Sequence, residues 1–236
     1  MFTDSSDIYD LVYSFKDYEK ESADIIQTIK TSRPECKTIL DIGCGTSEHH
    51  KYLSKHFSID GIDLNDKFIE TSKQKNPSGH YSVENMIQFD LGKQYDVIIC
   101  LFSSIGYLQT VDEIVSALKC FNKHLKPNGL LIVEPWFNKD SWHKGKVHML
   151  ASDKEDIKIC RMNRSYLSGD FSILNFHYLV GTMDNGVQHF QEEHKLRLTS
   201  KEEMFNAFKL ADLDVTFDEK GLIGRGMYYG NKKTLA

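Results

Sequence analysis

The chain has 236 residues, of which 40% are hydrophobic and 27% are charged, and its formal net charge is -5. This length suits one α/β domain with an insertion, and the composition excludes an intrinsically disordered chain. The weak negative charge disfavours a nucleic-acid-binding protein, which would usually be basic, so we expect no nucleic-acid partner.

The first residues of the chain do not match a secretion signal, and the cysteine spacing does not match a metal site. No apolar run is long enough to cross a membrane, and the first ten residues lack the basic and apolar regions of a signal peptide. The five cysteines are odd in number and include no C-x-x-C pair. We therefore expect a cytoplasmic protein with no membrane partner, no disulfide framework and no bound metal.

In the first half of the chain, helix and strand patterns alternate. A helical pattern with Ala23, Ile26 and Ile29 on one face ends at Pro34. Strands are then expected at 38–42, 57–63, just before residue 83, at 95–100 and at 130–133. Helices are expected at 46–56, 66–75 and on the face formed by Ile114, Ala117, Leu118, Phe121 and Leu125. This alternation predicts βαβ units and a parallel sheet.

The pattern changes after Trp136. No helix is expected from about 144 to 198, where strands at 157–166, 171–183 and 187–198 are separated by turns such as Asp184-Asn185-Gly186. A helix at 201–211 and two final strands at 215–219 and 226–229 follow. We predict a doubly wound, mostly parallel, seven-stranded α/β sheet formed by residues 1–136 and 199–236, with residues 137–198 as a small antiparallel β insertion that contributes to the substrate site.

A candidate cofactor site follows the first predicted strand. The strand ends in Asp41, and Gly43-Cys44-Gly45 makes a turn into the next helix, where the backbone can approach a ligand closely. Asp63 ends the next strand and can accept hydrogen bonds from both ribose hydroxyls. The alternative is that the glycines only make a tight turn. On this hypothesis a valine at Gly43 would block cofactor binding and leave the fold intact.

Two cofactors suit this layout, NAD and S-adenosylmethionine (SAM). The dinucleotide fingerprint needs a small third residue, and this chain has Glu48 there, which would place negative charge near a pyrophosphate. SAM has no phosphate, and its cationic amino group suits Asp41. After the third strand, Asn85 can accept from the adenine amino group, and Met86 either contacts the adenine ring or packs in the core. These residues favour SAM.

The chain resembles class I SAM-dependent methyltransferases through its segment from Asp41 to Thr46. It also resembles a narrower group, the N,N-dimethyltransferases of nucleotide-linked 3-amino-deoxysugars, over nearly its whole length. The segments that carry this second resemblance are Tyr9-Asp10-Leu11, Lys16-Asp17-Tyr18, Phe102 to Leu108, Val133 to Trp136, His189-Phe190 and Gly224 to Gly230. The resemblance implies a Rossmann-like fold and methyl transfer to an amino sugar.

The resemblance also implies roles for single residues. The cofactor-binding set would be Tyr18, Asp41, Gly43, Gly45, Asp63, Asn85, Met86 and Leu101, and the catalytic pair beside the sugar amine would be Tyr9 and Tyr107. Trp136 would contact the substrate, and Arg225 would bind its diphosphate. Asn85 departs from the more usual aspartate. A homodimer is also expected.

Methyl transfer to a neutral amine needs alignment more than a base, so we expect tyrosine hydroxyls to position the amine. Each assignment has an alternative. Tyr107 could be half-buried with its hydroxyl in water, Trp136 could cover the domain junction, and Arg225 could pair with Asp218 or Glu219. The histidines at 49, 50, 143 and 148 form no convincing metal set.

Other functions stay open at this point. One is a SAM-dependent methyltransferase of another small amine or alcohol. A nucleic-acid base methyltransferase would carry an Asn/Asp-Pro-Pro-aromatic motif where this chain has Leu101-Phe102-Ser103-Ser104. A non-catalytic SAM-binding module and an NAD-dependent oxidoreductase are the remaining alternatives, and Glu48 disfavours the latter.

Overall fold

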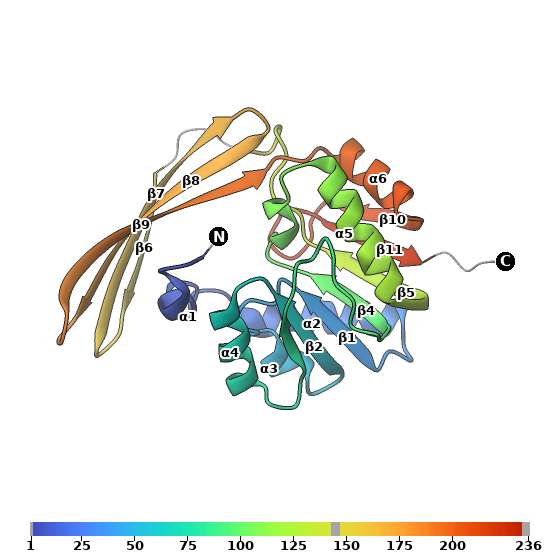
Figure 1. Ribbon diagram of the computed structural model, residues 1–236, viewed down its shortest axis with the longest axis horizontal. Helices are drawn as coiled ribbons and strands as arrows, with labels where there is room; N and C mark the ends of the chain where they lie inside the picture. The colour runs from blue at the N-terminus through green and yellow to red at the C-terminus, as the bar shows by residue number, and fades with distance from the viewer. Residues whose placement is uncertain (1, 143–146, 233–236) are drawn as a thin grey trace.

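The computed structural model describes residues 2–142 and 147–232 (Figure 1). Their helices are η1 (Ser6–Ile8), α1 (Tyr9–Val12), α2 (Tyr18–Ser32), α3 (His50–Leu53), α4 (Asp66–Lys75), η2 (Ser104–Tyr107), α5 (Val111–His124) and α6 (Lys201–Leu210). Their strands are β1 (Thr38–Ile42), β2 (Ser58–Asp63), β3 (Tyr81–Val83), β4 (Tyr95–Cys100), β5 (Leu125–Val133), β6 (Val147–Asp153), β7 (Ile157–Ser168), β8 (Phe171–Thr182), β9 (Gly186–Arg197), β10 (Leu213–Asp218) and β11 (Met227–Lys232).

The larger sheet has seven strands in the order β10-β11-β5-β4-β1-β2-β3. Its pairs are parallel except those of β11, which runs antiparallel to both β10 and β5. Apolar residues of α5 and α6 pack on one face of the sheet, and those of α2 and α3 pack on the other. The predicted doubly wound, mostly parallel sheet and its final hairpin are confirmed.

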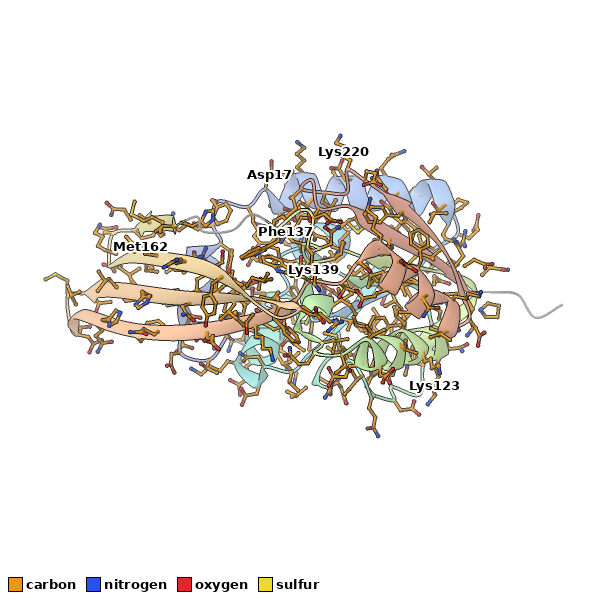
Figure 2. All side chains as sticks on the ribbon, turned by 90° about the horizontal axis from the view of Figure 1, so that it is seen from above. Asp17, Lys123, Phe137, Lys139, Met162 and Lys220 are labelled. Carbon is orange, nitrogen blue, oxygen red and sulfur yellow. The ribbon has the colours of Figure 1, made fainter. Side chains whose placement is uncertain are left out.

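The second sheet is antiparallel, in the order β6-β7-β8-β9. Figure 1 shows it curving away from the main sheet, with the N-terminal segment and α1 on its inner side. A separate cluster of buried residues fills this space, with Tyr9 and Tyr13 from the N-terminal segment against Phe176 and Tyr178 of β8. Seen from above in Figure 2, Phe137 and Lys139 lie where the two sheets meet, whereas Met162 lies out on the insertion.

The structure differs from the predictions at three places. The helix predicted at 46–56 is reduced to α3, because Ser47 adopts a φ of 60°, which a continuous helix does not allow. Leu125 is buried as predicted, but it begins β5 and does not belong to α5. The strand β6 was not predicted. The predicted division into 1–136 with 199–236 and 137–198 stays a prediction, since η1 and α1 pack against the inserted sheet.

The described residues contain no helix long and apolar enough to cross a bilayer. Within the same residues, no group of three or more histidine, cysteine or acidic side chains is arranged to hold a metal ion.

Candidate active site

The candidate site lies where the direction of strand order reverses, between β1 and its neighbour β4. The turn after β1 and the turn after β4 touch each other here, because the Ser104 hydroxyl donates to the Gly43 carbonyl oxygen at 3.3 Å. In open α/β sheets this crevice, beyond the carboxyl ends of the strands, is where ligands bind.

Both glycines of the turn after β1 have left-handed backbone angles, with φ of 69° at Gly43 and 55° at Gly45. A Cβ at Gly43 would lie 2.7 Å from the Ser104 side chain, so valine there would displace the neighbouring turn. The substitution would therefore disturb the contact between the two turns as well as the ligand site, and the expectation that the fold stays intact remains a prediction. A Cβ at Gly45 would meet no described atom within 4 Å, which leaves this glycine as the open edge of the turn.

The carboxylate of Asp63 is held against this turn. Oδ2 of Asp63 accepts from the Gly45 N–H and Oδ1 accepts from the Asn65 N–H, both at 2.9 Å. Burial raises the pKa of Asp63, and the two backbone hydrogen bonds act in the opposite direction. Each carboxylate oxygen keeps a second lone pair, so Asp63 can still accept from hydroxyl groups of a ligand.

Asp41 belongs to a buried network beneath the turn. Its Oδ2 lies 3.0 Å from Nε2 of His50, and Nδ1 of His50 lies 2.7 Å from the Tyr81 hydroxyl. Oδ1 of Asp41 is buried without a hydrogen-bond partner among the described residues. His50, one of the histidines that form no convincing metal set in the sequence, is thus fully buried and uses both ring nitrogens in this network.

One cavity of about 320 Å³, at the small end of ligand sites, brings most of the predicted site residues together. Its lining includes the predicted Tyr9, Gly43, Gly45, Asp63, Asn85, Met86, Tyr107, Trp136 and Arg225. Tyr18, Asp41 and Leu101 are not among the described residues that line it. Leu101 is buried in the core on the α2 face of the sheet, and Tyr18 packs its ring 5.0 Å from that of His49. Their contacts with a cofactor stay predictions.

The part of the cavity that the sequence analysis assigned to adenine has both apolar and polar residues in its lining. Leu64, Met86 and Ile87 line it, and Asn85 lies exposed beside them. Oδ1 of Asn85 accepts from the Ile87 N–H at 3.1 Å, so one lone pair of this oxygen is already used within the turn. The remaining lone pair is the acceptor that the sequence analysis assigned to adenine.

The turn after β4 carries Tyr107 and is strained. Phe102 and Ser103 have left-handed φ angles of 50° and 63°, which cost non-glycine residues about 1 kcal/mol or more each. The end of β5 holds them, because the Phe102 N–H donates to Oε2 of Glu134 and the Ser103 hydroxyl donates to the Pro135 carbonyl, both at 2.7 Å. A backbone held against its preference in this way fixes the position of η2 and of Tyr107.

Arg225 lies at the boundary between this cavity and a second, larger groove. Its Nη2 is 3.5 Å from Oε1 of Glu134, and its guanidinium lies 5.2 Å from the Trp136 ring. The alternative pairing with Asp218 or Glu219 is therefore wrong. Burial lowers the pKa of Arg225, while Glu134 raises it. Its Nε has no partner among the described residues.

The groove on the other side of Arg225 is about 830 Å³ and is lined by aromatic side chains and by charged side chains of both signs. The aromatic residues include Phe15, Phe137 and Trp142, the cations include Lys16, Lys20 and Arg161, and the acids are Asp17, Glu21 and Asp24. Lys16 is paired with Glu21 at 2.8 Å. Sequence reasoning missed Arg161, whose Nη1 donates to the Tyr13 hydroxyl at 3.0 Å and whose Nε is buried without a described partner. Arg161 and Arg225 therefore both line this groove, and the Nε–H of each has no hydrogen-bond partner among the described residues.

The structure also shows two site residues that the sequence analysis missed, His194 and Glu192 of β9. The Tyr107 hydroxyl lies 2.6 Å from Nδ1 of His194, so the alternative with this hydroxyl in water is wrong. Nε2 of His194 lies 3.6 Å from Oε2 of Glu192. The available signal was the alternation of Glu192, His194 and Leu196, which places two polar side chains on a buried strand face.

Trp136 joins the two sheets and also lines the cavity. Its indole N–H donates to the Ser172 hydroxyl of β8 at 2.7 Å. The junction role and the substrate role proposed for this residue are therefore compatible.

Comparison with known proteins agrees with this geometry. A family profile described as a methyltransferase domain matches residues 14–180. The dTDP-3-amino-3,6-dideoxy-alpha-D-glucopyranose N,N-dimethyltransferase of Streptomyces fradiae is 32% identical over 95% of this chain and 89% of its own. The corresponding 3,4,6-trideoxy enzyme of Streptomyces venezuelae is 31% identical over 96% of this chain and 97% of its own.

Solved structures show the same similarity. The crystal structure of Streptomyces venezuelae DesVI matches with a TM-score of 0.92 and 30% identity, and covers 99% of this chain and 100% of its own. SAM-bound CalS10, an amino pentose methyltransferase from Micromonospora echinaspora, matches with a TM-score of 0.87 and 28% identity over 99% of this chain and 98% of its own.

Proposed function

The chain belongs to the family of SAM-dependent methyltransferases, and we propose that it N-methylates the amino group of an amino-deoxysugar carried on a nucleoside diphosphate. The observation that carries the substrate assignment is the position of Arg225. This buried cation forms part of the wall of the cavity and part of the wall of the aromatic groove, where Lys20 and Arg161 are further cations. A sugar amine in the cavity and a nucleotide in the groove would place the diphosphate between them, beside the guanidinium.

The residues of the cavity suit the cofactor. Asp63 would accept from the ribose hydroxyls, Gly43 and Gly45 would lie along the methionine part, and Asn85 with Met86 would contact adenine. Gly45 lines the cavity and has no described atom within 4 Å of its Cβ position, so the ligand could approach the backbone there. When bound, SAM supplies the methyl group from a sulfonium centre.

The protein's own contribution to the chemistry is positioning in a largely aromatic and apolar site. A neutral amine is already a good nucleophile, so the barrier falls mainly through alignment of the nitrogen with the methyl group. Tyr9 and Tyr107 both line the cavity, and burial raises the pKa of each, so both stay protonated as neutral hydroxyls. We assign them to holding the amine and its sugar, with no obligatory base.

A direct assay tests this proposal. The purified protein would be incubated with SAM and a panel of nucleotide-linked amino-deoxysugars, the same sugars without nucleotide, and unrelated small amines and alcohols. Mass spectrometry should show methylation of a nucleotide-linked amino sugar and much slower reaction of the free sugar. Equal rates with and without the nucleotide would contradict the role of Arg225 and the groove, and would favour the alternative of another small acceptor.

Two further assignments rest on the same proposal. An enzyme acting on SAM and a sugar nucleotide would meet both in the cytoplasm, which is the location we assign to it. A homodimer is also part of the proposal, and light scattering of the purified protein tests it.

A further inference from the structure

The geometry points to Glu192 and His194 as positioning residues that make the Tyr107 hydroxyl a hydrogen-bond acceptor toward the substrate amine. This inference rests on the proposed function, because it concerns how the same site holds the amine that it methylates. It adds two residues of the inserted sheet to the reaction.

The first step concerns the proton between Tyr107 and His194. Their hydroxyl oxygen and Nδ1 are 2.6 Å apart, and only one proton can lie between them. Either His194 carries it on Nδ1 and donates to the tyrosine, or Tyr107 donates its own proton to an unprotonated Nδ1. The tautomer of His194 decides between these two arrangements.

Glu192 selects the tautomer. Its Oε2 lies 3.6 Å from Nε2 of His194, beyond hydrogen-bond distance, and Nε2 has no other partner among the described residues. The negative charge on that side favours a proton on Nε2. Burial alone would raise the pKa of Glu192, but the nearby His194 and the hydrogen bonds from Ser5 and Thr3 outweigh burial and lower it, so Glu192 is an anion. Burial lowers the pKa of His194, which keeps it neutral. A neutral imidazole with its proton on Nε2 presents Nδ1 to Tyr107 as an acceptor.

Both groups are held rigidly enough for this selection. Oε1 of Glu192 accepts from the N–H groups of Thr3 and Ser5 at 2.8 and 3.0 Å, and Oε2 accepts from the Ser5 hydroxyl at 2.5 Å. The His194 ring packs with centroid distances of 4.4 Å to Phe2 and 4.9 Å to Phe176. Neither side chain can turn away without breaking these contacts.

The direction of the Tyr107 proton determines how the substrate amine can bind. Because the single proton of Tyr107 is directed to His194, the tyrosine oxygen can only accept a hydrogen bond on its cavity side. An amine N–H would donate to it, and the nitrogen lone pair would remain free to face the methyl group. With the opposite tautomer, the tyrosine proton could point at the lone pair and block the nucleophile. A tertiary amine has no N–H to donate, so the same geometry predicts that methylation stops after two methyl groups.

Two isosteric substitutions separate this role from simple packing. His194→Asn places an amide oxygen near the position of Nδ1 and keeps an acceptor for Tyr107, whereas His194→Gln reaches toward the position of Nε2 and removes that acceptor. We expect His194→Gln to lower kcat about tenfold with KM changed less than threefold, and His194→Asn to restore most of this loss. His177→Gln, an exposed histidine on β8, is the matched control.

A double-mutant cycle gives the decisive readout. If His194 acts through the hydroxyl of Tyr107, His194→Gln should have no further effect on kcat in the Tyr107→Phe protein. Additive losses would mean that His194 only supports the structure, and would overturn the inference. Equal activity of His194→Gln and wild type would also overturn it. A wild type that methylates none of the amines tested would overturn the proposed function itself.

A measurement without turnover keeps the inference testable if variants fold poorly. Nitrogen-15 NMR of histidine-labelled protein reports which ring nitrogen of each histidine carries the proton, and the His194 signals are those that vanish in His194→Asn. The expected state is a neutral ring protonated on Nε2, with Glu192→Gln shifting the tautomer balance. A ring protonated on Nδ1 in the wild type would contradict the inference.

Discussion

Oε1 of Glu134 lies 3.5 Å from Nη2 of Arg225, and both side chains are almost completely withdrawn from solvent. The other oxygen of Glu134 accepts from the Phe102 N–H at 2.7 Å. One carboxylate therefore connects the arginine assigned to the substrate with the strained turn that carries Tyr107. It also fixes the guanidinium from one side and leaves Nε without a described partner.

Arg225→Ala should raise KM for a nucleotide-linked amino sugar with a smaller change in kcat. The diphosphate is remote from the methyl group, so the arginine binds the ground state and the transition state alike. A lost charge-assisted contact costs about 1.5–3 kcal/mol, which corresponds to roughly 10- to 100-fold in KM. Steady-state kinetics with saturating SAM measure this.

The control for Arg225 concerns the carboxylate left behind. Removing the arginine alone leaves the buried carboxylate of Glu134 without its cationic partner. An unpaired buried charge destabilises a folded protein by itself. The double variant Arg225→Ala/Glu134→Gln removes that charge, and thermal unfolding shows how much stability returns. An equal rise in KM for the free amino sugar, which has no phosphate, would show that Arg225 does not act on the diphosphate.

Gly45→Ala should weaken SAM binding at least tenfold in calorimetry. Gly45 has a φ of 55° and lines the cavity with open space at the Cβ position, so a methyl group there would occupy ligand volume. Gly186→Ala is a matched control, because Gly186 has a φ of 62° and equally open surroundings on the inserted sheet. Both variants carry backbone strain of about 1 kcal/mol. If both weakened SAM binding equally, strain and not ligand contact would explain the loss.

Asp63→Ala should also weaken SAM binding. The carboxylate supports the glycine turn through the Gly45 N–H and is the acceptor assigned to the ribose hydroxyls. Loss of hydrogen bonds to a charged group predicts a rise in Kd of roughly 10- to 100-fold, or about 1.5–3 kcal/mol. Glu70→Ala removes an exposed acid from the adjoining helix α4 and should leave Kd unchanged. An Asp63→Ala protein that binds SAM as tightly as wild type would rule out the ribose assignment.

Glu192 should make the stability of the protein depend on pH on the acidic side. Its pKa is lower in the folded chain than the ordinary value of 4.5, so the folded state binds fewer protons than the unfolded state. Its stabilisation is therefore present above the unfolded pKa and is lost as pH falls below it. Glu192→Gln should unfold at a lower temperature than wild type at neutral pH, and the difference should shrink between about pH 5 and pH 3.

The neighbouring acid tests whether that dependence is specific. Glu193 is exposed on the same strand, so Glu193→Gln should leave the pH dependence of the melting temperature as in wild type. If the two variants behaved alike, the hydrogen bonds from Thr3 and Ser5 would not be the source of the effect.

Local signals were enough to predict the main sheet and the cofactor turn. The glycines in the segment from Asp41 to Gly45 allow the left-handed backbone angles of the turn. The apolar composition of β4 and of the end of β5 indicates that these strands are buried. Strand β6 escaped prediction because its alternate residues, such as Val147 and Met149, are exposed, so no buried face marks it as a strand.

The site residues that were missed share a different cause. His194 and Glu192 lie on a strand whose inner face is buried by the N-terminal segment. A contact between residues 3 and 192 cannot be predicted from the hydrophobic pattern around either residue. Arg161 is similar, because Tyr13 and Phe176 surround it only in the folded chain. Burial of a polar side chain depends on what packs over it, which one-dimensional patterns do not contain.

The bond between Ser5 and Glu192 spans 187 residues, so the segment around Ser5 leaves the ribosome well before its partner strand. At ordinary rates of synthesis, the N-terminal segment would wait roughly 10–40 s before β9 emerges. Its aromatic residues would be uncovered during that interval and available to chaperones. The amine site could therefore close only after β9 has emerged and packed against this segment.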